Sequence, residues 1–201
     1  MRTTLRPIAV RVNPVILVIL VGFVVSSRGV VVSPLASTAL AARQRAPRAS
    51  PHDTVSATVD GADVTITYGR PSMRGRTIFG ALVPYGRVWC PGADEATTLD
   101  STRGLQIGAL SVPAGPHTIW MLPTADAWTL IISTEPSGFH TRYSASADLG
   151  RIELRKAALA DPPGGVETLT FIIETQAPAQ GGVIKMRWET TEVSAPFTVV
   201  R

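Results

Sequence analysis

The sequence contains a single cysteine, Cys90, and no asparagine after Asn13. A domain with one cysteine has no internal disulfide, so its stability must come from packing. The lack of asparagine excludes N-glycosylation and asparagine metal ligands from the chain beyond Asn13. A Gly-x-Ser-x-Gly elbow, a phosphate-binding loop and a dinucleotide fingerprint are also missing, which sets aside the enzyme classes that these motifs define.

Excess positive charge is confined to the first 48 residues. Seven arginines precede the first acidic residue, Asp53, whereas the chain beyond Arg48 carries 12 basic and 15 acidic side chains, a net charge of −3. The calculated isoelectric point of about 9.8 therefore does not describe the folded domain. Because that domain lacks a basic stripe, we expect no nucleic-acid partner.

The first 41 residues have the order of a secretory signal. Basic residues come first, an apolar run from Val15 to Val25 follows, and small residues end in Ala39-Leu40-Ala41. We expect residues 1–41 to be a signal peptide, since a membrane span needs about 20 apolar residues. An uncleaved N-terminal membrane anchor is the alternative, because apolar residues resume after Arg28. With residues 42–51 as a flexible linker, the remaining domain is expected to be periplasmic or extracellular.

Beyond Pro51 the apolar residues recur with a period of two, the spacing of strands with one buried face. Segments 55–59 and 64–68 flank an Asp60-Gly61 turn signal and predict a hairpin. The later alternating segments are residues 105–109, 119–121, 128–132, 152–154, 169–173, 184–188 and 197–199. About nine or ten such strands predict an all-β domain over residues 52–201, an antiparallel, jelly-roll-like β-sandwich. A short helical turn is expected near residues 77–82 or 146–149.

The stretch from Tyr68 to Leu99 forms an unusually long connection between two predicted strands. Loops longer than about 12 to 15 residues are uncommon in compact domains unless they are functional or disordered. This loop carries too much apolar surface to remain in water. Its large apolar residues are Ile78, Phe79, Leu82, Val83, Tyr85 and Trp89. We therefore expect an ordered loop that folds over the domain and contains the candidate site.

Short motifs follow one another through this loop. They are Tyr68-Gly69-Arg70-Pro71-Ser72, Gly75-Arg76, Ile78-Phe79-Gly80, Leu82-Val83-Pro84-Tyr85-Gly86, Val88-Trp89 and Gly92-Ala93-Asp94-Glu95-Ala96-Thr97-Thr98. In these motifs the chain resembles a bacterial family, domain of unknown function 2911, over roughly residues 50–200. Members look like exported single-domain proteins, so the resemblance implies location and domain limits but no reaction. The family usually has Arg-Thr where this chain has Cys90-Pro91, so any ligand contact that this arginine makes in other members is missing here.

Arg70 falls on the core side of the hairpin if the strand continues past Tyr68, because side chains alternate along a strand. A buried guanidinium needs a carboxylate partner, and we predict an ion pair of Arg70 or Arg76 with Glu95 or Asp94. Such a pair either pins the loop onto the sandwich or lines a pocket. Asp94 and Glu95 are expected to begin the next strand, so their adjacent carboxylates can face one ligand only where the backbone is irregular.

The three histidines show neither His-x-His nor His-Glu-x-x-His spacing. The sequence therefore predicts no metal site and no cofactor, unless distant residues converge on Asp94, Glu95 or Cys90. We expect His117 at the edge of the core and His52 in the terminal linker. Cys90, between an aromatic residue and a proline, is expected to be a packed thiol rather than a nucleophile.

The leading hypothesis is an exported module that binds a ligand or serves a structural role, with a small molecule, glycan or protein as partner. Membrane contact is expected only through an uncleaved N-terminal segment. The candidate site residues are Tyr68, Arg70, Arg76, Trp89, Asp94, Glu95 and His117. The alternative is a hydrolase or metal-dependent enzyme that uses Glu95 and His117 with a second acid, and a third possibility is a structural partner domain tethered by its N-terminus.

Overall fold

The computed structural model describes residues 48–160, 164–176 and 181–200. The predicted signal peptide or anchor, residues 1–41, lies outside these residues, as does most of the predicted linker. Within these ranges the chain forms eleven strands: β1 (His52–Val59), β2 (Ala62–Gly69), β3 (Thr98–Ser101), β4 (Leu105–Ile107), β5 (Leu110–Val112), β6 (Gly115–Pro123), β7 (Trp128–Ser133), β8 (Asp148–Ala158), β9 (Val166–Thr175), β10 (Gly182–Glu189) and β11 (Thr191–Val199). A 3₁₀ helix, η1, spans Ala145–Ala147. In the part of the chain described, no helix has the length and apolarity needed to cross a membrane.

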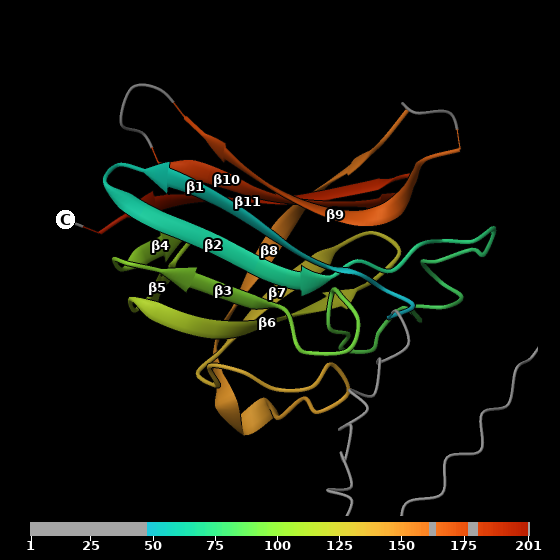
Figure 1. The fold of residues 1–201 in the computed structure, drawn as a ribbon, viewed down its shortest axis with the longest axis horizontal. Helices are drawn as coiled ribbons and strands as arrows, with labels where there is room; N and C mark the ends of the chain where they lie inside the picture. The colour runs from blue at the N-terminus through green and yellow to red at the C-terminus, as the bar shows by residue number, and fades with distance from the viewer. Residues whose placement is uncertain (1–47, 161–163, 177–180, 201) are drawn as a thin grey trace, which may run out of the picture. The chain divides into compact units, whose positions relative to one another are not determined.

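All strand pairings are antiparallel and follow the order β1-β2-β3-β6-β7-β8-β11-β10-β9, with β4 attached to β11 and β5 attached to β4. Strand β8 turns the sheet, because it pairs with β7 up to Leu154 and with β11 from Arg155 onward. The sheet thereby folds over on itself, with β1 to β3 on one side of the core and β9 to β11 on the other (Figure 1). The predicted all-β antiparallel fold is confirmed, as one sheet that curls almost into a closed barrel.

The strand pattern differs from the prediction at two places. Gly108, with φ of 57°, divides the predicted strand 105–109 and turns the chain into the β4–β5 hairpin. The strand after the long loop begins at Thr98 rather than at Asp94 or Glu95. The predicted helical turn near 146–149 corresponds to η1.

Strands β1 and β2 form the predicted hairpin. Asp60 and Gly61 have φ values of 48° and 77°, and positive φ at both central residues defines the type I′ turn that suits twisted strands. The register pairs Val59 with Ala62 and runs on to His52 opposite Gly69. This register fixes which residues lie beside one another at the far end of the hairpin.

The long loop contributes side chains to the main core, as its apolar content predicted, but Leu82 and Tyr85 are exposed. Ile78, Phe79 and Val83 are buried. The Phe79 ring lies edge-to-face against Trp128 and Trp188, with ring centroids 4.7 and 6.0 Å apart. The loop is therefore ordered by core packing, which burial of aromatic surface favours.

Strands β1 and β9, the two ends of the main strand order, lie side by side without a backbone ladder between them. We call this junction the seam. Side chains from the end of β2 bond to the free edge of β9 across it. The Phe171 N–H donates to Tyr68 Oη at 3.1 Å, and Arg70 Nε donates to the Leu169 carbonyl at 3.3 Å.

The start of the long loop continues the closure of the seam. The Leu169 N–H donates to the Pro71 carbonyl at 3.0 Å, and the Met73 N–H donates to the Glu167 carbonyl at 2.8 Å. Residues 71–73 thus act as a short strand along β9. Residues 68–73 therefore pair the backbone groups that β9 would expose as an edge strand.

Replacing Tyr68 by Phe removes the acceptor of the Phe171 N–H and keeps the ring. A buried donor left unpaired costs about 1–3 kcal/mol, and we expect that loss in the free energy of unfolding measured by urea denaturation. Tyr85→Phe is the matched control, because the Tyr85 side chain is exposed and a change there should stay within about 0.5 kcal/mol. Equal effects of the two substitutions would contradict the seam contact.

Candidate functional site

The end of the long loop meets the start of β1 because Gly69 has no side chain. A Cβ on Gly69 would lie 2.2 Å from the Ala93 carbonyl oxygen, so any other residue would push the loop away. Gly69 is the register partner of His52. The loop consequently delivers Asp94 and Glu95, which follow Ala93, to the side of His52.

The backbone is irregular at Asp94, where φ is 66°. This left-handed conformation interrupts the extended chain directly before Glu95, so Asp94 and Glu95 need not point to opposite faces as adjacent strand residues do. The metal-ligating atoms of His52, Asp94 and Glu95 all lie within 4.8 Å of one another. His52 Nε2 is 2.7 Å from Glu95 Oε2 and 4.0 Å from Asp94 Oδ2. We call these three residues, together with Arg48, the corner cluster.

Arg48 binds the Glu95 carboxylate with both ends of its guanidinium. Nη1 lies 2.7 Å from Oε2 and Nη2 lies 3.0 Å from Oε1, and Nη1 also contacts His52 Nε2. The hydrogen bonds from Arg48 hold the pKa of Glu95 below its usual range, and Glu95 in turn raises the pKa of Arg48. The side chains are 43% and 53% exposed, so this pair adds little to stability.

A third segment, the loop after β7, contacts the backbone of the corner cluster. The Asp94 carbonyl accepts hydrogen bonds from His140 Nδ1 at 2.6 Å and from the His140 N–H at 3.1 Å. Glu95 forms an isolated bridge with Phe139, and the Ala96 N–H donates to the Gly138 carbonyl at 3.0 Å. These bonds fix the Asp94 backbone in the conformation that brings both carboxylates to His52.

The predicted ion pair of Arg70 or Arg76 with Glu95 or Asp94 is wrong. Arg70 instead binds Asp53, with Nη1 3.0 Å from Oδ2. The hairpin register explains this choice, because Asp53 lies opposite Tyr68 and is therefore diagonal to Arg70 on the same face. Arg76 donates to the carbonyls of Ser72 and Met73 within the loop itself.

Tyr68 and Trp89 serve the fold rather than a pocket. Tyr68 is 2% exposed, and burial raises the pKa of its hydroxyl. Trp89 stacks on Trp188 with ring centroids 6.0 Å apart, and its backbone exchanges two hydrogen bonds with Met121. These contacts hold both rings in the fold, and none of them is with a residue of the corner cluster.

The structure does not bring His117 to Glu95. His117 is buried, and its Nδ1 and Nε2 lie 3.0 and 3.1 Å from the carbonyls of Ser133 and Pro113. Its register partner is Leu99, four residues beyond Glu95, or about 13 Å along an extended chain. The imidazole beside Glu95 is that of His52.

Cys90 is the packed thiol that the sequence predicted. It is 1% exposed in a small cluster with Ala96, Trp120 and Ile131. Burial raises the pKa of the thiol to about 11, against hydrogen bonds from Thr97 that lower it. A thiol with this pKa carries almost no thiolate near neutral pH.

Sequence reasoning did not identify five residues that build this region: Arg48, His52, Asp53, His140 and Glu189. Glu189 accepts hydrogen bonds from the backbone N–H groups of Ile78 and Phe79, at 3.1 and 3.3 Å, and so anchors the long loop. The hairpin register could have identified Asp53 and His52. No local pattern marks Glu189 or His140, because both act on segments far away in sequence.

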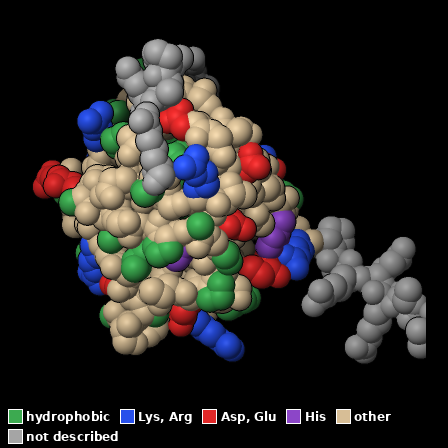
Figure 2. Space-filling model, turned by 90° about the vertical axis from the view of Figure 1, so that its left-hand side faces the viewer, with side chains coloured by type: hydrophobic (Ala, Val, Ile, Leu, Met, Phe, Trp, Pro, Cys, Tyr) green, Lys and Arg blue, Asp and Glu red, His purple; other side chains and the backbone are tan. Residues whose placement is uncertain are grey.

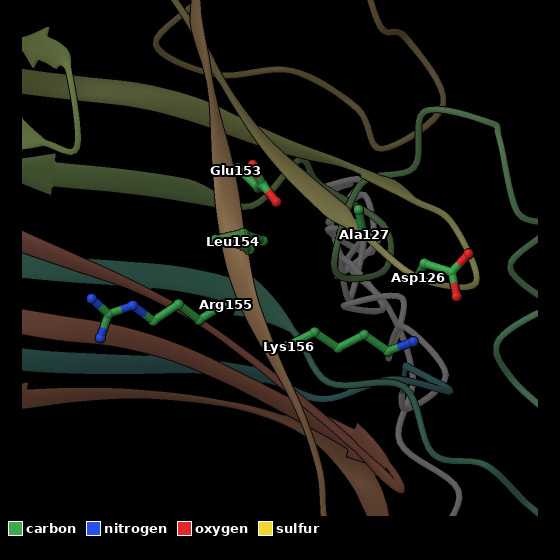
Figure 3. A pocket seen from close by; sticks show the side chains of 6 residues that line it. All are labelled: Asp126, Ala127, Glu153, Leu154, Arg155 and Lys156. Atoms are coloured by element: carbon green, nitrogen blue, oxygen red, sulfur yellow. The ribbon is translucent and has the colours of Figure 1, made fainter.

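An open depression of about 530 Å³ lies where β8 leaves β7 (Figure 3). Its charged lining consists of Asp126, Glu153, Arg155 and Lys156. Arg155 and Lys156 extend to opposite sides of β8 in Figure 3, and Lys156 Nζ binds the Ala125 carbonyl. Its charged side chains do not converge on a common point, in contrast to the corner cluster.

A family model described as "Protein of unknown function (DUF2911)" matches residues 50–197. The chain therefore belongs to this family, and the resemblance predicted from the loop motifs is confirmed. Comparisons with the curated proteins and with the solved structures give no match.

Glu95 should titrate below the ordinary range of glutamate, and Arg48→Ala should move its pKa upward. A carboxyl whose folded pKa is depressed stabilises the fold above its unfolded pKa, and this contribution is lost as the pH falls through the folded pKa. Side-chain carbon shifts of Glu95 followed by NMR against pH measure both values. The same pKa in the wild type and in Arg48→Ala would contradict the pairing.

Proposed function

We propose that this chain, as a DUF2911 protein, is an exported module of the bacterial envelope that binds a ligand at the corner cluster. The observation that carries this proposal is the convergence of an imidazole, two carboxylates and a guanidinium from separate segments at the protein surface. Asp94 and Glu95 keep exposed oxygens, with 43% and 53% of their side chains accessible. Binding residues are often found on loops that a rigid scaffold positions.

The other candidate side chains support a binding role over hydrolysis. His117 is engaged with two backbone carbonyls, and the Cys90 thiol is buried with a raised pKa. Arg70 closes the seam with Asp53 and Thr170. Among the described residues, these groups are engaged in structural contacts and do not form a nucleophile and base pair.

Export is supported by the amino-terminal sequence. The order of basic, apolar and small residues up to Ala41 is that of a secretory signal. The face drawn in Figure 2 carries acidic and basic side chains interspersed, so it offers no continuous basic surface to a nucleic acid.

The ligand role is tested by a thermal-shift screen with monosaccharides, short peptides, dicarboxylates and divalent cations. We expect at least one compound to raise the melting temperature of the wild type but not of Glu95→Gln. A ligand present at 100 times its Kd raises the free energy of unfolding by about 2.7 kcal/mol. Glu153→Gln is the matched control and should respond like the wild type. A set of shifts that is identical in all three proteins, or no shift at all, would refute the site.

Export is tested separately by cell fractionation and N-terminal sequencing of the protein from its native host. A mature chain that starts at Ala42 in the periplasm or medium is the expected result. An intact chain in the membrane fraction, with the domain outside, would identify an anchor and keep the export proposal. An intact chain in the cytosol would contradict it.

A further inference from the structure

We propose that the ligand of the corner cluster is a first-row divalent transition metal ion such as Zn²⁺, and that Arg48 competes with it for Glu95. This inference rests on the proposed function, because it names the chemistry of the same site. His52, Asp94 and Glu95 supply the ligands, and the remaining coordination positions are open to water or to a second ligand.

The spacing of the three ligand atoms suits one metal ion. Two ligands of a tetrahedral Zn²⁺ lie about 3.4 Å apart when each bond is about 2.1 Å long. The observed distances from His52 Nε2, 2.7 Å to Glu95 and 4.0 Å to Asp94, fall on either side of this value. The three side chains are 31%, 43% and 53% exposed, which leaves them room to rotate toward a common metal ion.

The types of donor decide which metal is favoured. Ca²⁺ and Mg²⁺ prefer shells made of oxygen, whereas an imidazole nitrogen with carboxylates suits the divalent ions of the first transition row. Side chains of adjacent residues in a strand point to opposite faces, so two such carboxylates do not normally bind one ion. Here Asp94 has a left-handed φ, and both carboxylates lie near His52.

The contacts of Arg48 show independently that this position attracts a cation. Its guanidinium holds both oxygens of Glu95 and touches His52 Nε2. The contact of His52 with Glu95 requires a proton on Nε2, whereas the contact with Arg48 requires its lone pair. One protonation state cannot satisfy both contacts. A metal ion in place of the guanidinium would bind the lone pair and the carboxylates together.

Exchange between Arg48 and a metal ion needs little structural change. The Arg48 side chain is 43% exposed, and an exposed ion pair of this kind is weak. His140 binds the backbone carbonyl of Asp94, so it holds the main chain that carries this ligand. Arg48 therefore balances the carboxylate charge until a metal ion displaces it.

The test is isothermal titration of ZnCl₂ and MnCl₂ into the metal-free protein, purified as the cell produces it and without a histidine tag. We expect one ion per chain in the wild type, with MgCl₂ binding far more weakly. His52→Gln and Glu95→Gln should each weaken binding by at least about tenfold, the loss seen even for outer-shell partners. Arg48→Ala should tighten binding by up to about fivefold, because the competing ion pair is lost.

Asp100→Asn and Glu153→Gln are matched controls, because both side chains are exposed and neither belongs to the corner cluster. They should bind the metal like the wild type, and circular dichroism checks that every variant is folded. Absence of binding in both the wild type and Arg48→Ala would overturn the metal proposal, as would binding that His52→Gln and Glu95→Gln leave unchanged. If metal binding is absent but another compound in the thermal-shift screen depends on Glu95, the metal inference fails while the proposed binding function stands.

Discussion

The free edge of β9 must find hydrogen-bond partners, and residues 68–73 supply them. Tyr68 accepts the Phe171 N–H, Arg70 donates to the Leu169 carbonyl, and the backbone of residues 71–73 pairs with the same strand. Without these contacts the curled sheet would end in two open edges, each a template for aggregation. The seam therefore replaces the missing backbone ladder between β1 and β9.

The same six residues also determine where a ligand-binding site can form. Once residues 71–73 follow β9, the long loop must return across the end of the hairpin to reach β3. Gly69 permits this return because its missing side chain leaves room for the Ala93 carbonyl. The return places Asp94 and Glu95 beside His52 and Arg48. The corner cluster is thus a consequence of how the sheet closes.

Much of the fold follows from local sequence patterns. Period-two alternation predicted most strands, and the Asp60-Gly61 pair predicted the first turn, because both are set by residues close in sequence. The inward position of Arg70 was predicted correctly from the same alternation. Its partner was not, although the hairpin register already placed Asp53 on the diagonal.

The candidate site was only partly predictable. The loop was identified as its location, and Asp94 and Glu95 as members, but the strand alternation assumed for them ends at the left-handed Asp94. His52 was placed in a linker because the first strand begins earlier than its apolar pattern suggests. His140 and Glu189 contact the loop from more than 40 residues away, and a single sequence carries no local signal for such contacts.

Hydrogen exchange of individual amides, followed by NMR, reports whether residues 68–73 close the sheet. We expect the N–H groups of Leu169, Phe171 and Met73 to exchange as slowly as interior amides of β10, since all three are bonded across the seam. Rapid exchange of these three amides, at the rate of an open edge strand, would contradict closure of the sheet by residues 68–73.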